Sequence, residues 1–317
     1  MQSQAVSQMH YNDFNAMSTS VLLAAEGPAE AVETGFEEVR RFVAAAEQRF
    51  TRFSEESELS RLNRSAGSWF EASPDLYEVV KLALQFYDQT EGLFDPGVLD
   101  ALELAGYDRT IAELRQYGAP QAAQVLTMPR TVRFGSLRLD PLSKRIRLPD
   151  GLRIDLGGIA KGWIAGRAAH ILSRWTPACA VDAGGDVFLH GLPQGESCWR
   201  VALEDPQDPS RTLAVLKLPP GAVATSTTTR RRWQQNGKER HHLIDPRTRQ
   251  PSQSNLQSVT VIAKSAVEAE VYAKVLLIGG SKEVSRISRL EAGVEFIAVD
   301  QNGKLWGSKH SREYLDV

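Results

Sequence analysis

Residues 153–162, with the sequence RIDLGGIAKG, combine the residue types of a phosphate-binding turn. We interpret them as a strand that ends at the carboxylate of Asp155, a turn on two glycines, and a helix that carries Lys161 in its first turn. Glycine lets a ligand approach the backbone closely, and the N–H groups at a helix N-terminus attract phosphate. Asp155 can accept hydrogen bonds from a ligand, and Lys161 can neutralise a phosphate. The alternative is structural, because Asp155 can simply cap the helix.

A second group of reactive side chains lies in residues 241–246, HHLIDP. His242 has an ordinary pKa near neutrality, which suits a general base, and Asp245 is an alternative base. A histidine beside a proline turn also often serves as a structural hydrogen-bonding residue. Three consecutive arginines, residues 230–232, can dock an acidic acceptor or a phosphate, or can lie in solvent on a hairpin.

Composition narrows the class of protein. The chain has 317 residues, enough to bury a large core, and a formal net charge of -2, which does not favour binding to nucleic acid. It has no apolar run of roughly 18 residues, so we expect no membrane span.

Residues 1–15 lack the basic and apolar regions of a secretory signal, so we expect a cytoplasmic protein. Cys179 and Cys198 are too few for a disulfide scaffold or a zinc cluster, and we interpret them as reduced thiols.

The first third of the chain reads as mostly helical elements. Apolar residues at spacings of three and four predict an amphipathic helix over residues 29–50. Ser57 and Ser73 stand where an N-cap would begin the next two helices. The expected elements of this part are a strand over residues 16–25 and helices over residues 29–50, after Ser57, and over residues 74–88, 99–106 and 111–117.

Strands dominate the rest of the chain. We expect antiparallel strands within residues 131–153, a helix over 159–175, strands over 178–182, 187–189, 199–204, 213–218, 222–226 and 258–263, helices over 267–277 and 283–290, and a closing hairpin of 294–300 and 305–308. Because helices and strands are segregated along the chain, this order predicts an α+β fold with a mostly antiparallel sheet and helices packed on it. We find no repeat and no linker, so we expect one domain over residues 1–317.

These segments, in this order, resemble the FAD:protein FMN transferase (ApbE) family. The resemblance covers residues 14 to about 280. The matching segments are AMST at 16–19, FSEESELSRLN at 53–63, GLFDP at 92–96, DLGGIAKG at 155–162, AGG at 183–185, ATS at 224–226 and HHLIDP at 241–246. The resemblance implies a single T-fold-like α+β domain.

The resemblance also implies an activity. The family binds FAD with Mg²⁺ and transfers the FMN half to a threonine or serine hydroxyl of an acceptor protein, with release of AMP. In this chain the hydroxyl would attack the FMN-side phosphorus, with His242 or Asp245 as the base. Two alternatives use the same pocket: a pyrophosphatase that splits FAD into FMN and AMP with water as the nucleophile, and a non-catalytic FAD-binding protein.

The nucleotide pocket implied by the resemblance consists of Met17, Phe53, Leu93, Phe94, Asp95, Asp155, Lys161, Thr225 and Ser226. Met17 and Phe53 would pack against the flat rings of the ligand, although both can be ordinary core residues. Lys161 would neutralise the pyrophosphate. Thr225 and Ser226 would offer hydroxyls near the phosphates, unless they are only strand formers.

One departure from the family pattern concerns the metal. The family holds Mg²⁺ with an aspartate, a threonine and a backbone carbonyl, and the matching positions here are Glu270, Lys274 and Gly158. Protonated Lys274 cannot coordinate Mg²⁺, which prefers oxygen ligands. Either Glu270 and the Gly158 carbonyl hold the ion with extra waters while Lys274 points elsewhere, or the Lys274 ammonium substitutes for part of its charge. We favour a retained but weakened metal site. The structural alternative is an ordinary i,i+4 ion pair.

Overall fold

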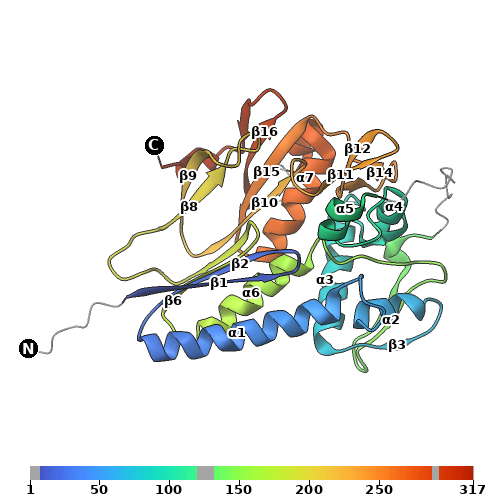
Figure 1. Cartoon of the computed structure of the whole chain (residues 1–317), viewed down its shortest axis with the longest axis horizontal. Coiled ribbons are helices and arrows are strands. Elements are labelled where there is room, and N and C mark those ends of the chain that lie inside the picture. The colour runs from blue at the N-terminus through green and yellow to red at the C-terminus, as the bar shows by residue number, and fades with distance from the viewer. Residues whose placement is uncertain (1–7, 120–131, 288–292, 317) are drawn as a thin grey trace, which may run out of the picture.

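An antiparallel sheet of eight strands forms the centre of the computed structural model, which describes residues 8–119, 132–287 and 293–316 (Figure 1). The strand order is β1-β2-β6-β7-β10-β15-β16-β17. Their bounds are β1 Met9–Ala16, β2 Thr19–Glu26, β6 Ala178–Ala183, β7 Asp186–His190, β10 Gly221–Thr227, β15 Leu256–Ala263, β16 Glu295–Asp300 and β17 Leu305–Gly307. Every neighbouring pair is antiparallel, which confirms the expected α+β class with a mostly antiparallel sheet.

Three helices, α1 (Ala29–Phe50), α6 (Ala160–Leu172) and α7 (Ala266–Ile287), cover one face of the sheet. The apolar positions of α1 face the core, as its spacing predicts. In Figure 1, α6 lies between α1 and the sheet, and α7 crosses β10 and β15. Two helices were expected over the span of α7, and the backbone does break at Gly280, which has a φ of 70°. The expected end of the second helix lies outside the described residues.

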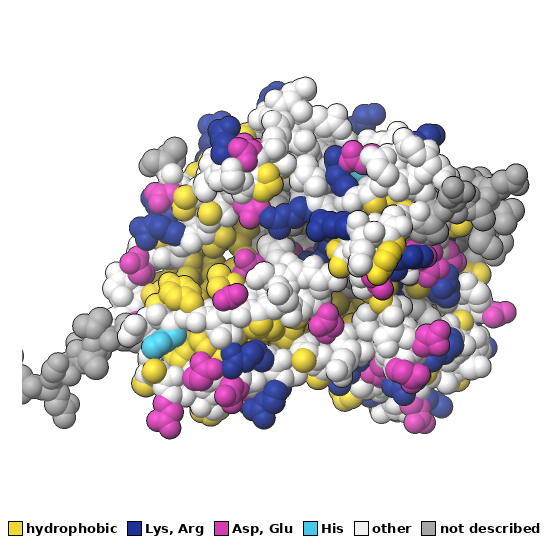
Figure 2. Space-filling view, viewed as in Figure 1, with side chains coloured by type: hydrophobic (Ala, Val, Ile, Leu, Met, Phe, Trp, Pro, Cys, Tyr) yellow, Lys and Arg dark blue, Asp and Glu magenta, His cyan; other side chains and the backbone are white. Residues whose placement is uncertain are grey.

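The opposite face of the sheet is covered by the hairpin of β8 (Trp199–Glu204) and β9 (Thr212–Leu218). Strand β10 therefore buries both of its faces: Ala222 and Ala224 face the helices, and Val223 faces the hairpin. A cavity of about 480 Å³ lies between the sheet and the hairpin. Figure 2 shows hydrophobic side chains gathered on this part of the surface, whereas charged side chains of both signs are interspersed elsewhere.

A lobe formed by α3 and several shorter elements packs at one end of α1, α6 and α7. Its first helices begin at the predicted caps, because Ser57 accepts a hydrogen bond from the Ser60 N–H at 3.0 Å and Ser73 accepts one from the Leu76 N–H at 3.2 Å. The elements are α2 Glu58–Arg64, β3 Phe70–Glu71, α3 Pro74–Gln89, η1 Pro96–Val98, α4 Leu99–Leu104, α5 Ile111–Tyr117, η2 Phe134–Ser136, β4 Arg138–Asp140 and β5 Arg145–Arg147. Part of the expected strand region, residue 131, lies outside the described residues.

Short strands complete the chain on the side of α4 and α5. They are β11 Arg232–Gln235, β12 Lys238–His241, β13 Ile244–Asp245 and β14 Gln250–Pro251, and η3 Ser311–Tyr314 follows β17. Trp233 of β11 packs with Leu102 of α4 and Ile111 of α5 in a small separate cluster. Through Trp233, this cluster anchors the β11–β12 hairpin, which leads into residues 241–246.

Two expectations about strands are wrong. Residues 16–25 are not one strand, because β1 ends at Ala16 and a two-residue turn at Met17 and Ser18 leads into β2. Both turn residues have a positive φ, 54° and 56°, as a type I′ hairpin turn requires. Residues 153–155 are not a strand either. Their backbone is held by the Asn63 side chain, which accepts from the Ile154 N–H at 2.8 Å and donates to the Ile154 carbonyl at 2.9 Å.

Among the described residues, no helix combines the length and apolar character needed to cross a bilayer. The cytoplasmic location stays a prediction, as does the assignment of the whole chain to one domain.

Candidate active site

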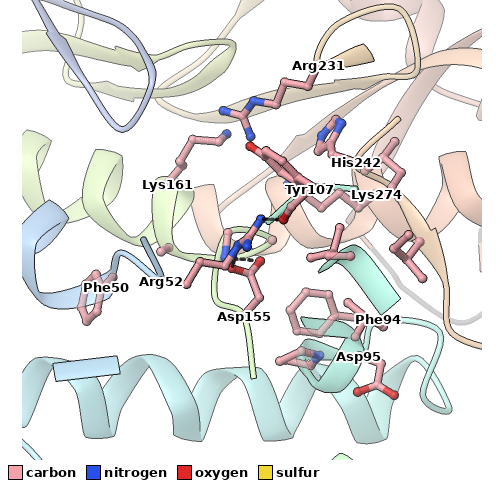
Figure 3. A pocket seen from close by; sticks show the side chains of 18 of the residues that line it. Phe50, Arg52, Phe94, Asp95, Tyr107, Asp155, Lys161, Arg231, His242 and Lys274 are labelled. Atoms are coloured by element: carbon pink, nitrogen blue, oxygen red, sulfur yellow. Dashed lines mark hydrogen bonds and ion pairs between the residues drawn. The ribbon is translucent and has the colours of Figure 1, made fainter. Parts of the chain in front are cut away.

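A cavity of about 250 Å³ opens where the β1–β2 turn, the end of α1, the start of α6 and the side of α7 meet (Figure 3). Its lining is drawn from residues far apart in the sequence, from Met17 to Ile278. The predicted site residues in its lining are Met17, Phe53, Leu93, Phe94, Asp95, Asp155, Gly158, Lys161, His242 and Lys274. The fold therefore brings most of the predicted residues to one place.

The glycine turn before α6 stands as expected, but several N–H groups in it and in the first turn of the helix already have partners within the protein. The helix begins at Ala160, whose N–H donates to the Leu156 carbonyl at 2.9 Å. The Gly162 N–H donates to Glu270 Oε2 at 2.7 Å. Asp155 Oδ2 accepts from the Gly157 N–H at 3.1 Å. Because these donors are used inside the protein, the positive charge for a phosphate must come largely from side chains.

One wall of the cavity combines aromatic rings with a guanidinium group. Arg52 lies 4.2 Å from the ring centre of Phe53 and 4.6 Å from that of Tyr107. Its Nε lies 3.4 Å from Asp155 Oδ1, and its Nη2 donates to the Tyr107 carbonyl at 2.6 Å. Tyr107 stacks in turn on Trp233, with ring centres 5.2 Å apart. Sequence reasoning missed Arg52 and Tyr107, since no periodicity or motif marks them.

A buried network of four charges lies across the cavity from this wall. Lys161 forms ion pairs with Asp186 and, at 3.5 Å, with Glu270 Oε1. Lys274 lies 2.7 Å from the same oxygen of Glu270. The side chain of Glu270 is 0% exposed, whereas those of Lys161 and Lys274 are 14% and 12% exposed, toward the cavity that both line. The two lysines thus present their ammonium groups to a ligand from an anchored position.

Burial shifts the pKa values of this network. Burial lowers the pKa of Lys161 to about 7, although Glu270 opposes the shift. Burial likewise lowers the pKa of Lys274, again against the attraction of Glu270. For Glu270, burial by itself raises the pKa, but the charges of Lys274 and Lys161 outweigh it, so the pKa lies below its ordinary value. Glu270 is therefore ionised at neutral pH.

The two adjacent histidines differ in their surroundings. His241 has both ring nitrogens engaged, with Nε2 3.0 Å from the Ser252 carbonyl and Nδ1 accepting from the Leu243 N–H at 3.3 Å. His242 lines the cavity beside Arg231 and Lys274 (Figure 3), and its buried Nδ1 has no hydrogen-bond partner among the described residues. Burial and the nearby positive charges keep the pKa of His242 well below its ordinary value, so the ring is neutral.

Four predicted residues lie away from the cavity lining, namely the fully buried Glu270, Asp245, Thr225 and Ser226. Asp245 is held by Arg247, whose Nε and Nη2 donate to its two oxygens at 2.9 and 2.8 Å. Thr225 contacts Thr260 through their hydroxyls at 2.9 Å, on the side of the sheet that faces the second cavity. Ser226 is buried and lines neither cavity. His242 lines the cavity and Asp245 does not, so His242 is the better candidate for the base.

The arginine run also divides between different places. Arg231 lines the cavity, in a backbone conformation with a φ of 52°. Arg230 instead pairs with Glu204, and Arg232 pairs with Glu239. Of the three, Arg231 alone lines the cavity, where its guanidinium group joins the cationic groups of Arg52, Lys161 and Lys274.

The residues at the expected metal position do not fit Mg²⁺. Both oxygens of Glu270 are engaged, one by the two lysine ammonium groups and the other by the Gly162 N–H. Lys274 points at Glu270, so the interpretation in which it points elsewhere is wrong. Among the described residues, no three acidic, histidine or cysteine side chains gather closely enough to hold an ion. Mg²⁺ needs several oxygen ligands at about 2.1 Å, and this position offers ammonium groups instead.

Comparison with known proteins relates the whole arrangement to one family. A family model described as "ApbE family" matches residues 17–298. The chain is 30% identical over 249 residues to the FAD:protein FMN transferase of Vibrio cholerae, with 77% of this chain and 73% of that protein covered. It is 27% identical over 289 residues to the enzyme of the same name from Escherichia coli, covering 88% and 81%. The ApbE protein of Thermotoga maritima has a similar structure, with a TM-score of 0.83 at 25% identity over 97% of this chain and 99% of that chain.

Proposed function

The chain belongs to the ApbE family, and from that premise we propose that it is an FAD:protein FMN transferase. Its substrates would be FAD and an acceptor flavoprotein that offers a threonine or serine hydroxyl. Its products would be the FMN-modified acceptor and AMP. The observation that carries the proposal is the position of a neutral histidine, His242, in a cavity that also presents Lys161, Lys274 and Arg231.

Binding would use the two unlike sides of the cavity. The pyrophosphate of FAD carries about two negative charges, and the ammonium groups of Lys161 and Lys274 would neutralise them with the guanidinium group of Arg231. Apolar and aromatic side chains such as Phe53 and Phe94 would pack against the rings of the nucleotide. Phosphoryl transfer depends mainly on such positioning and charge neutralisation.

The transfer step would form one bond and break another. The oxygen of the acceptor hydroxyl attacks the FMN-side phosphorus of FAD, and the bond from that phosphorus to the bridging oxygen breaks. AMP leaves with the electron pair of the broken bond, close to the cations. The hydroxyl proton passes to His242, and Nε2 is the ring nitrogen that can take it, because Nδ1 is enclosed by protein.

A product assay tests this proposal. The purified chain is incubated with FAD and an acceptor flavoprotein domain, and the products are weighed by intact-mass spectrometry and separated by chromatography. We expect one FMN added to the acceptor and an equal amount of AMP, and no addition to an acceptor whose target hydroxyl residue is replaced by alanine. Free FMN and AMP with an unmodified acceptor would instead identify a pyrophosphatase. Unchanged FAD would identify a binding protein.

A further inference from the structure

We propose that the ammonium group of Lys274 takes the place of a divalent cation, so that this chain binds FAD without Mg²⁺. The inference rests on the proposed function, because it concerns the phosphate contacts of the same cavity. It differs from the expectation of the family resemblance, which implies that FAD binding requires Mg²⁺.

The first observation is that Glu270 has no oxygen left for a metal. Oε1 receives the ammonium groups of Lys274 at 2.7 Å and Lys161 at 3.5 Å, and Oε2 receives the Gly162 N–H at 2.7 Å. A protonated lysine has three donors and no acceptor, so it competes with a metal for the carboxylate and cannot share the metal. A cation could enter only by displacing these donors from a fully buried side chain.

The second observation is the path of the Lys274 side chain. A β-carbon placed on Gly158 would lie 3.6 Å from Lys274 Cδ and 3.9 Å from its Cε. The lysine therefore runs from α7 past the glycine turn, and its ammonium group ends at Glu270. Gly158 and Glu270 are two of the three positions at which the family would hold its ion. Lys274 is the third, and its ammonium group lies against the Glu270 carboxylate that would bind the ion.

The third observation is that Glu270 is fixed by the crossing of two helices. Helices α6 and α7 approach so closely that a β-carbon on Gly162 would lie 2.4 Å from the Ala266 carbonyl oxygen and 3.1 Å from Glu270 Cβ. The carboxylate is thereby held against the first turn of α6, where the Gly162 N–H meets it. It cannot turn toward a metal elsewhere in the cavity without losing that hydrogen bond.

The balance of charge points the same way. Two acids, Glu270 and Asp186, are matched by two ammonium groups, those of Lys161 and Lys274. Arg231 adds a further positive charge to the lining of the same cavity. A divalent cation placed beside Glu270 would be repelled by the two ammonium groups that already pair with that carboxylate. An incoming pyrophosphate would meet the guanidinium group of Arg231 and the ammonium groups of both lysines in the lining of the cavity.

The affinity for FAD, measured by quenching of flavin fluorescence, tests the proposal on the full chain. We expect the Kd of the natural protein to agree within about twofold in EDTA and in MgCl₂. Lys274→Met should raise the Kd by roughly 10- to 100-fold, the range for loss of one charged hydrogen bond, with no rescue by Mg²⁺. Lys81→Met, at an exposed position of α3, is the matched control and should leave the Kd unchanged.

A double variant tests the converse, that restoring the oxygen ligands makes FAD binding depend on Mg²⁺. Glu270→Asp with Lys274→Thr restores the oxygen ligands of the family pattern, so FAD should bind more tightly in MgCl₂ than in EDTA. A Kd for the natural protein that rises tenfold or more in EDTA would overturn the proposal, whether or not the variants fold. Metal-independent binding of FAD without release of AMP would support this inference and would refute the proposed transfer.

Discussion

Individual side chains in the cavity owe their chemistry to burial. Lys161 has a pKa of about 7 because burial disfavours its charged form, so its charge is lost over a pH range in which an exposed lysine stays protonated. His242 is neutral for the same reason. A single environment thus supplies a cation for the phosphates and a neutral base for the acceptor hydroxyl.

The pH dependence of FAD binding should report the charge of Lys161. Lys161 is protonated below pH 7 and neutral above it, so the Kd for FAD should rise between pH 6 and 8.5, by up to about tenfold per pH unit above the pKa. Lys161→Arg keeps its charge over this range and should flatten the profile. Titration of FAD at a series of pH values checks this. A flat profile for the natural protein would show that Lys161 does not contact the phosphates.

The neighbouring histidines should respond differently to the same substitution. His242→Gln should slow FMN transfer by about 10²- to 10⁴-fold, because the proton acceptor is lost, while the Kd for FAD stays within about threefold. His241→Gln should lower stability, since both ring nitrogens make contacts within the protein, and should leave the rate per folded molecule nearly unchanged. Single-turnover rates with urea unfolding of each variant distinguish the two effects. Equal losses of rate would contradict the assignment of His242.

At the scale of elements, the crossing of α6 and α7 places the charged network. Gly162→Ala should destabilise the protein by about 1–3 kcal/mol, because the new β-carbon would overlap the Ala266 carbonyl and force the helices apart. Gly166→Ala, one turn further along α6, is the matched control. Its β-carbon would meet no heavy atom nearer than 4.0 Å, and alanine favours the helix, so stability should rise by about 0.4–1 kcal/mol. Urea denaturation of both variants measures this, and equal stabilities would argue against a tight crossing.

Local sequence signals predicted the elements that depend on local chemistry. Helix α1 has the predicted bounds, and the helices after Ser57 and Ser73 begin at those caps. The turn inside residues 16–25 was missed because Met17 and Ser18 are not the Asn and Gly residues that usually mark a type I′ turn. Residues 153–155 stand directly before the glycine turn, where a strand was expected, yet their backbone is held by Asn63, a contact that no local pattern reveals.

The residues of the candidate site also fall into two groups, those predictable from local sequence and those that depend on tertiary contacts. Lys161, Gly158 and His242 stand in contiguous motifs, so the sequence alone located them and the structure places them in one cavity. Arg52 and Tyr107 act through contacts with each other and with Asp155, which depend on the tertiary fold. Side chains alternate between the two faces of strand β10, and this explains why Thr225 and Ser226 lie away from the cavity. Their side chains leave opposite faces of the strand, and neither face at that point borders the cavity.

At the scale of the whole molecule, the cavity joins parts of the chain that are distant in sequence. The β1–β2 turn, the lobe of short helices, the start of α6 and the side of α7 all contribute to its lining. In Figure 1 these elements meet beside the end of the central sheet. A ligand bound there contacts segments from both ends of the chain, from the β1–β2 turn to α7, so its binding energy should stabilise the molecule as a unit.

Thermal unfolding therefore tests whether residues 1–317 form one domain, as we propose. We expect a single calorimetric transition, and we expect FAD at 100 times its Kd to stabilise the folded state by about 2.7 kcal/mol, since it binds that state alone. For a chain of this length the midpoint should rise by roughly 5 °C. AMP, which lacks the flavin and one phosphate, is the matched control and should raise the midpoint less at the same concentration. Two transitions, with only one of them moved by FAD, would show instead that the chain folds as two units and that the cavity belongs to one of them.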